Sequence, residues 1–204
     1  MATNVYVDGF NLYYGSLKDR PYRWLDLDAL SRVLLPRDQI NRIRYFTARV
    51  SDRRYNVGQA ARQDIYLRAL RTIGHVSIHE GQFQTKPKSM ALASPPYRVV
   101  RVLKTEEKGS DVNLASFVLL DAFKKDCDTA VVISNDSDLA EPVRLAQDEF
   151  GITVGVVNPH PAKRRSRELQ ASFFRQLRNG ALKRSQFPAT LTDANGSITK
   201  PPSW

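Results

Sequence analysis

A short apolar run at residues 130–133, Ala-Val-Val-Ile, constrains the fold of this chain more than any other feature. The run is rich in β-branched residues and does not alternate with polar ones, which is typical of a parallel strand buried on both faces. Such a strand needs helices on both sides of its sheet. Asp136 and Asp138 follow closely, at the carboxyl edge where open α/β sheets bind their ligands.

Strand-like and helix-like segments alternate along the rest of the chain. The expected strands are 4–7, 40–50, 76–79, 129–133 and 152–157, and the expected helices are 10–17, 25–35, 56–73, 110–123 and 139–150. This alternation predicts an α/β fold with a mostly parallel, doubly wound sheet. Residues 82–97 contain three prolines and are expected to form a mobile loop or an irregular hairpin, and residues 166–184 are expected to be helical in part.

The length of 204 residues allows one α/β domain with a sizeable core. The sequence shows no internal repeat and no second domain, so we expect one domain over residues 1–185. From Pro188 onward the chain is polar. Residues 186–204 are therefore expected to form an irregular C-terminal tail.

The chain carries a formal net charge of +10 at pH 7 and has a pI of about 9.9. A protein this basic often binds a polyanion, and nucleic acid is the default candidate. A solvated basic surface without a partner is the alternative. Charge alone does not decide between the two.

The sequence contains one cysteine, Cys127, which has no partner for a disulfide within the chain and belongs to no CxxC metal motif. Its neighbours Asp126 and Asp128 are acidic and would not lower the pKa of the thiol, so we do not expect a reactive cysteine. The first residues lack the layout of a signal peptide, and no apolar stretch approaches the ~20 residues of a membrane span. These features predict a cytoplasmic protein without a membrane segment.

Four aspartates share one pattern, in which an extended segment ends, an Asp follows and a helix begins. They are Asp8, Asp111, Asp136 and Asp138. Because the carboxyl ends of parallel strands lie along one edge of a sheet, these carboxylates are expected to converge. A set of oxygen ligands suits Mg²⁺ and would support phosphodiester cleavage. The three histidines show no zinc-ligand spacing.

Helix capping is the competing explanation for these aspartates. Asp is a favoured N-cap, so capping is the simpler explanation for any one of them alone. Asp138 and Glu141 also have the spacing of a capping box. Asp136 stands beside Asp138, however, and one cap cannot use both carboxylates. The pair therefore favours a metal site over capping.

Three segments resemble the motifs of the NYN domain family, a PIN-like nuclease group that includes LabA-like proteins. Residues 7–12 read Val-Asp-Gly-Phe-Asn-Leu, residues 108–112 read Lys-Gly-Ser-Asp-Val, and residues 134–139 read Ser-Asn-Asp-Ser-Asp-Leu. They occur in the order and spacing of the family. The resemblance implies a PIN-like three-layer α/β/α sandwich with a central, mostly parallel sheet, and a ribonuclease that depends on Mg²⁺ or Mn²⁺.

Carried onto this chain, the resemblance implies that the four aspartates are both the catalytic residues and the metal ligands. Asn11 would orient a carboxylate or contact a phosphate, and Ser134 would donate a hydrogen bond beside the site. The chain also departs from the family pattern.

Asn135 replaces the usual Gly, Leu139 replaces an aromatic residue, and Phe117 stands where some relatives carry a polar or acidic group. Glu107 is a candidate to compensate for Phe117, although a solvated side chain is the favoured interpretation of its charged surroundings. These departures suggest a site with fewer acidic groups than in some relatives.

Basic residues follow the strands whose ends lie at the expected site. The candidates for RNA binding are Arg49, Arg53 and Arg54 after the second strand, and Lys163, Arg164, Arg165 and Arg167 after the fifth. Arg and Lys at these positions would hold phosphates without reading the base sequence. Tyr13, Tyr14 and Tyr55 are candidates to stack on unpaired bases. For each residue taken alone, a solvated or packing role is the alternative.

The first functional hypothesis is a metal-dependent ribonuclease that acts on single-stranded or loop RNA. The second is a non-catalytic RNA-binding or scaffold protein that keeps the PIN-like fold. A magnesium phosphatase or phosphotransferase is the third, and it fits poorly because Phe10 stands where a second Asp would be needed after Asp8. A homodimer, in which a second subunit completes the groove over a narrow acidic site, is compatible with the sequence.

Overall fold

The computed structural model describes residues 1–52 and 57–204. Its centre is a seven-stranded sheet. The strands are β1 (Ala2–Asp8), β2 (Gln39–Ala48), β3 (Val76–Ala91), β4 (Val99–Lys108), β5 (Thr129–Ile133), β6 (Thr153–Asn158) and β7 (Phe173–Gln176). Their order in the sheet is β4-β3-β2-β1-β5-β6-β7, and all neighbours are parallel except β3 and β4.

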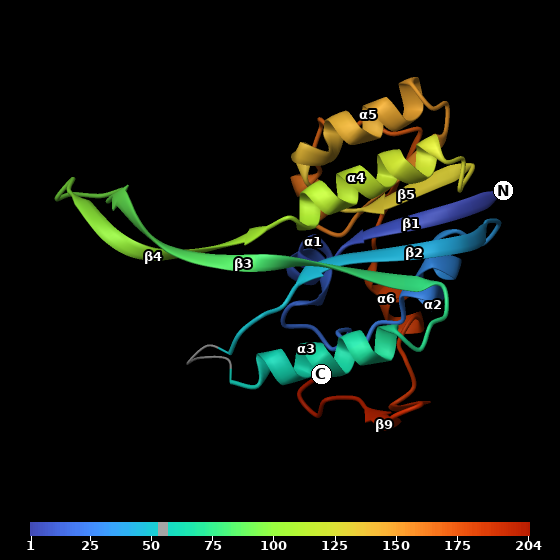
Figure 1. The fold of residues 1–204 in the computed structure, drawn as a ribbon, viewed down its shortest axis with the longest axis horizontal. Coiled ribbons are helices and arrows are strands. Elements are labelled where there is room, and N and C mark those ends of the chain that lie inside the picture. Colours follow the sequence, from blue (N-terminus) through green and yellow to red (C-terminus); the bar gives the residue numbers. More distant parts are fainter. Residues whose placement is uncertain (53–56) are drawn as a thin grey trace.

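Helices cover both faces of this sheet (Figure 1). They are α1 (Gly9–Leu12), which continues into the π-helical turn η1 (Tyr13–Leu17), α2 (Leu27–Leu34), α3 (Gln59–Leu70), α4 (Ser110–Phe123), α5 (Ala140–Asp148) and α6 (Asn179–Arg184). Short 3₁₀ turns, η2 (Ser137–Leu139) and η3 (Ala162–Arg164), follow β5 and β6. No helix in the described part of the chain is long and apolar enough to cross a membrane.

The core consists of two apolar layers, one on each face of the sheet. Val5 and Val7 of β1 face α2, α3 and α6, whereas Tyr6 between them faces α4 and α5. The same alternation occurs in β5, where all five residues are buried. The strand expected from the apolar run is therefore confirmed, and so is the three-layer α/β/α fold with a mostly parallel sheet.

The segment expected to be a loop or irregular hairpin is a regular antiparallel ribbon. Strand β3 pairs with β2 up to Gly81 and then with β4 from Gln82 to Ala91. The ribbon projects well beyond the body of the sheet (Figure 1). Pro87 lies in the part of β3 that has left β2, so the edge where its missing N–H would donate is open. Pro95 and Pro96 lie in the irregular turn at 92–98, so the expected irregular structure is found at the tip of the ribbon but not in its strands.

The expectation that residues 166–184 are helical in part is confirmed by helix α6, which follows the short edge strand β7. The irregular tail expected over 186–204 is wrong, because it contains the hairpin of β8 (Thr190–Asp193) and β9 (Gly196–Thr199). Phe187 and Ile198 are buried in the same core layer as α3. Because this segment is polar on average, its composition did not indicate that these two apolar side chains would be buried.

A buried ion pair joins the sheet to α4. Asp121 accepts hydrogen bonds from Arg44 Nε at 2.7 Å and Nη2 at 2.8 Å, and from the Tyr6 hydroxyl at 2.8 Å. The Asp121 side chain is 3% exposed and the Arg44 side chain 11%. The Arg44 guanidinium also lies 4.4 Å from the centre of the Phe117 ring. Phe117 therefore packs with this pair, on the side of α4 that faces β2 and β3.

Removal of one partner of this pair should destabilise the fold strongly. In Asp121→Ala the Arg44 charge stays buried without its carboxylate, so we expect the free energy of unfolding to fall by about 3–5 kcal/mol. Urea denaturation measures the change. The double variant Arg44→Met/Asp121→Leu should recover most of the loss, because it leaves no buried charge. The exposed pair of Glu141 and Arg144 provides the control, and Glu141→Ala should change stability little.

Candidate metal centre

Strand β1 lies at the point where the chain changes direction across the sheet. From β1 the chain builds β2, β3 and β4 on one side, and then β5, β6 and β7 on the other. The connections that leave the carboxyl ends of β1 and β5 therefore run in opposite directions along the sheet. The crevice between them is the place where α/β folds bind ligands. Asp8 ends β1, and Asp136 follows β5 by three residues.

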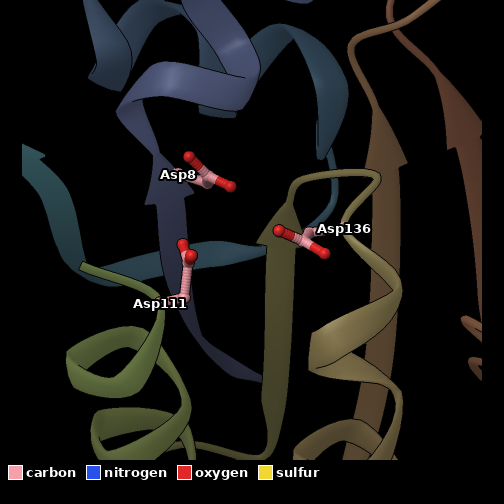
Figure 2. Close-up of side chains that lie close together, drawn as sticks. All are labelled: Asp8, Asp111 and Asp136. Atoms are coloured by element: carbon pink, nitrogen blue, oxygen red, sulfur yellow. The ribbon is translucent and has the colours of Figure 1, made fainter. Parts of the chain in front are cut away.

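Three carboxylates converge at this crevice. Asp8, Asp111 and Asp136 each offer an oxygen atom, and these atoms all lie within 4.8 Å of one another. They come from the end of β1, the first turn of α4 and the loop after β5 (Figure 2). Asp138, expected as the fourth member, does not belong to this group and is exposed. Its backbone N–H donates to Asp136 Oδ1 at 3.1 Å, so Asp138 serves the loop through its backbone.

Asp8 is both a helix cap and a member of the cluster. Its Oδ1 accepts from the Asn11 backbone N–H at 2.9 Å, and its Oδ2 accepts from the Ser134 hydroxyl at 2.9 Å. The residue is 4% exposed. Both carboxylate oxygens are thus held in place by the first turn of α1 and the end of β5. Capping and clustering are not alternatives at this position.

Asn11 and Ser134 fix the loop that carries Asp136. The Asn11 side-chain oxygen accepts from the Asn135 backbone N–H at 3.0 Å, and Ser134 Oγ accepts from the Asp136 N–H at 3.1 Å. Asp136 itself caps the turn η2. Asn11 and Ser134 therefore orient Asp8 and Asp136 through hydrogen bonds, and neither belongs to the group of three carboxylates.

Helix α4 brings Asp111 to the cluster through a left-handed glycine. Gly109 precedes the helix with φ of 103°, a conformation that favours glycine. The next residue, Ser110, donates from its backbone N–H and its hydroxyl to the carboxylate of Glu107, at 3.0 and 2.7 Å. Glu107 lines the cleft with the three aspartates. The favoured interpretation of Glu107 as a solvated residue is therefore wrong, and its spacing from Ser110 was the overlooked signal.

Gly9 explains why the first motif needs a glycine after Asp8. A Cβ atom at Gly9 would lie 2.7 Å from the Phe46 carbonyl oxygen and 2.8 Å from the Tyr45 ring. Helix α1 therefore starts in contact with β2, and only glycine allows this approach. The close contact sets the position of Asp8 at the floor of the crevice.

The cluster is electrostatically strained without a cation. Burial raises the pKa of Asp8 from 3.8 to about 7, and the carboxylates of Asp111 and Asp136 add to the rise. Burial also raises the pKa of Asp111, with contributions from Asp136 and Glu107. Lys18 and His160 also line the cleft around the group. Three acidic oxygens this close together match the ligands that Mg²⁺ and Mn²⁺ prefer, so the residues fit a divalent metal ion.

A cleft of about 810 Å³ opens over the cluster. Its walls include Tyr13 and Tyr14, and Phe83, Thr85 and Thr105 from the base of the β3–β4 ribbon. The volume lies in the range of sites that bind extended ligands. Tyr14 is 61% exposed and is placed to contact such a ligand.

The two groups of basic residues predicted to bind RNA lie in different surroundings. Arg49 pairs with Glu80, Nε to Oε2 at 2.7 Å, and with Asp64, so its charge is already compensated. Arg53 and Arg54, like Tyr55, lie outside the described residues. The second group, Lys163, Arg164, Arg165 and Arg167, is exposed in and after the turn η3.

Asn135 joins this second basic group to the cluster. Its side-chain nitrogen donates to the Arg164 carbonyl oxygen at 2.8 Å, and its side-chain oxygen accepts from the Ser166 N–H at 2.8 Å. The replacement of glycine by Asn135 thus ties the basic loop directly to the loop of Asp136. The replacement of glycine at this position did not by itself indicate the link, because the partners lie about 30 residues further along the chain.

The comparisons with known proteins agree with this arrangement. The sequence model of the NYN domain family matches residues 2–178, which include all three clustered aspartates. The chain belongs to the NYN domain family. An NYN domain implies a PIN-like nuclease fold, and nucleases with this domain generally use divalent metals.

The name of one curated relative describes a monooxygenase and not a nuclease. The chain is 30% identical over 236 aligned residues to 6-hydroxy-3-succinoylpyridine 3-monooxygenase HspA of Pseudomonas putida (strain DSM 28022 / S16), and the match covers 100% of this chain and 75% of the relative. A solved protein of unknown function, VPA0982 of Vibrio parahaemolyticus RIMD 2210633, is 19% identical with a TM-score of 0.56. That match covers 87% of this chain and 93% of the other, and it supports the fold alone.

Asp8→Asn should stabilise the metal-free NYN protein. The folded pKa of Asp8 lies above its unfolded value, so its contribution to stability is present below about pH 4 and is lost as the pH rises through about 7. At pH 8 in EDTA we expect Asp8→Asn to raise the free energy of unfolding by on the order of 3 kcal/mol. Urea titrations at pH 4 and pH 8 measure this difference.

The same variant should lose its thermal response to metal. Mn²⁺ should raise the Tm of the wild type, because binding to the folded state alone stabilises it, and should not raise that of Asp8→Asn. Asp148→Asn is the matched control, since that carboxylate is exposed on α5 and pairs with Arg144. An equal Mn²⁺ response in wild type and Asp8→Asn would contradict a metal site here.

Proposed function

We propose that this NYN protein is a ribonuclease that depends on Mg²⁺ or Mn²⁺ and cuts phosphodiester bonds in single-stranded or loop RNA. The observation that carries the proposal is the convergence of Asp8, Asp111 and Asp136 within 4.8 Å at the floor of an open cleft. The net charge of +10 and the family membership support a polyanionic substrate.

Asp8, Asp111 and Asp136 are the residues that would hold the ion. When bound there, a divalent ion would neutralise charge on a phosphodiester and favour ionisation of a water molecule. The protein contributes orientation. Ser134 and the Asn11 backbone fix both oxygens of Asp8, and Ser134 also holds the backbone of Asp136. Because Asp8 is 4% exposed, solvent competes little for its oxygens.

The walls of the cleft indicate how RNA would be held. The exposed basic loop at 163–167 is tied to the Asp136 loop through Asn135, so it lies near the cluster and suits phosphate groups. Tyr13 and Tyr14 line the cleft and offer rings for stacking. Stacking on protein rings requires unpaired bases, which favours single strands and loops over duplexes.

Purified protein should cleave a single-stranded RNA oligonucleotide in the presence of Mn²⁺ or Mg²⁺. The cleavage should stop when EDTA is added. Asp136→Asn should reduce the rate by at least about 100-fold, because loss of even an outer-shell partner of a metal site costs 10–100-fold. Gel analysis of end-labelled RNA measures the rate. Asp148→Asn on α5 is the matched control, since it is exposed and pairs only with Arg144 among the described ion pairs; it should leave the rate unchanged.

The non-catalytic alternative gives a different result in the same assay. A scaffold protein would bind RNA with strong salt dependence and produce no cleavage in either metal. Cleavage that continues in EDTA, or that survives Asp136→Asn, would exclude the proposed metal site. Duplex RNA of the same sequence tests the preference for unpaired strands and should be cut more slowly.

A second candidate function is oxygen insertion into a small heteroaromatic ring. It is favoured by the identity of 30% with a curated pyridine monooxygenase across this whole chain. A monooxygenase places one oxygen atom of O₂ in its product and reduces the other to water, so it needs two electrons from a reductant. O₂ uptake with 6-hydroxy-3-succinoylpyridine and a reduced nicotinamide, without RNA cleavage, would favour this function over the first.

A further inference from the structure

The β3–β4 ribbon reaches far beyond the cleft on a regular hydrogen-bonded framework. Its ten residue pairs run without a break from Gln82 opposite Lys108 to Ala91 opposite Val99. At the usual rise along an antiparallel strand, these pairs span about 30 Å. Figure 1 shows the ribbon standing away from the helical layers. A ligand that fills the cleft and continues along the ribbon must therefore be a long one.

The ribbon is basic over its outer length. Residues 82–105 contain five cationic side chains and no Asp or Glu. The five are Lys86, Lys88, Arg98, Arg101 and Lys104. Lys104 pairs with Glu106, whereas the other four belong to no ion pair among the described residues. A long surface of uncompensated positive charge fits a polyanion.

The strand register places two of these charges directly opposite each other. Lys86 pairs with Lys104 in the ladder, and Lys88 lies on the same face two residues from Lys86. Like charges directly opposite each other on a sheet are destabilising. Glu106 pairs with Lys104 and, at 3.3 Å, with Lys108, so it offsets part of this repulsion. A bound phosphate would relieve the remainder.

The positive charge begins at the rim of the cleft. Thr85 and Thr105 line the cleft, and Lys86 and Lys104 are the next residues outward along the two strands. Arg101 lies farther out, on the face of the ribbon that carries Thr85 and Thr105. A strand of RNA that leaves the cleft along the ribbon therefore meets cations from the rim outward.

The ribbon also exposes apolar side chains on the face that carries Arg101. Leu103 is 74% exposed and Val99 is 69% exposed. Such a face can also bind a second copy of the chain. Charge disfavours that contact, because each copy has a net charge of +10 and residues 82–105 contain no acidic side chain. RNA has the opposite charge, so charge complementarity favours RNA over a second copy.

We propose that the β3–β4 ribbon binds phosphates of the RNA substrate beyond the segment held in the cleft, through Lys86, Lys88 and Arg101. This contact rests on the proposed ribonuclease function and gives it a preference for long RNA. Contacts to phosphates hold the strand without reading its base sequence. Because the ribbon lies away from the three aspartates, it contributes to affinity and not to the chemical step.

RNA binding in EDTA measures the contact without cleavage. Single-strand sites typically span about 4–16 nucleotides, so a labelled RNA of about 30 nucleotides covers both the cleft and the ribbon. Fluorescence anisotropy at several salt concentrations gives the slope of log K against log[salt]. The triple variant Lys86→Gln/Lys88→Gln/Arg101→Gln should reduce this slope by about 2, since each phosphate contact to a single strand contributes about 0.7.

A matched control removes the same charge elsewhere. Lys124→Gln/Lys183→Gln/Arg184→Gln changes three exposed residues that lie outside the ribbon and the cleft, and it should leave the slope unchanged.

Exchange of the cation type separates charge from packing. The variant Lys86→Arg/Lys88→Arg/Arg101→Lys keeps all three charges and should keep the slope of the wild type. Far-UV circular dichroism and thermal melts confirm that each variant is folded.

Cleavage in Mn²⁺ should depend on the length of the RNA. The triple Gln variant of the ribbon should raise KM for the long RNA roughly tenfold with kcat unchanged, because it removes binding that the ground state and the transition state share. It should cut a tetranucleotide, which the cleft alone can hold, as fast as the wild type does.

The outcomes separate the ribbon contact from the ribonuclease function. Equal salt slopes in the wild type and the triple Gln variant would overturn the ribbon contact alone. Aggregation of that variant with an unchanged slope would do the same, because the lysines would then only protect an exposed edge. A wild-type dimer that Leu103→Ser dissociates, with RNA binding unchanged, would replace RNA by a second copy. Ribbon-dependent binding without cleavage would support the contact and overturn the ribonuclease.

Discussion

Mutual repulsion among three carboxylates is the constraint that the surrounding structure has to overcome. Burial and neighbouring charge both disfavour the ionised forms of Asp8 and Asp111, and Asp136 adds to the repulsion at each of them. They stay together because each belongs to the start of a helical segment or turn that follows the sheet or the ribbon. Stability is thus given up locally at a crevice whose carboxylates fit a cation.

The sequence predicted the features that depend on local pattern. The apolar run of β5, the helix α4 and the order of strands and helices follow from periodicity, and the structure has α4 at the expected bounds. The positions of Asp8 and Asp136 at one edge follow from the rule that parallel strands end together. Asp111 reaches the same edge for another reason, because antiparallel β4 returns to the point where β3 leaves β2. The link from Asp136 to Asp138 was predicted less well, because a spacing of two residues does not tell which carboxylate turns inward and which faces solvent.

The features that the sequence did not reveal depend on contacts between distant residues. The role of Glu107 requires Ser110 at the start of α4, and that of Asn135 requires the loop after β6. The C-terminal hairpin is polar on average and is held by Phe187 and Ile198, whose burial depends on the α3 side of the core. A hollow of about 150 Å³ beside the cleft likewise combines residues from the two ends of the sequence, Arg23 and Trp204 among them.

The β3–β4 ribbon and the third carboxylate share one continuous backbone. Strand β4 returns from the far tip of the ribbon to Lys108, and Gly109 then leads directly into the first turn of α4 with Asp111 (Figure 1). Phe83, Thr85 and Thr105 at the base of the ribbon also form one wall of the cleft. The root of the ribbon is therefore shared with the candidate metal centre, and a displacement there would move the Asp111 carboxylate and one wall of the cleft together.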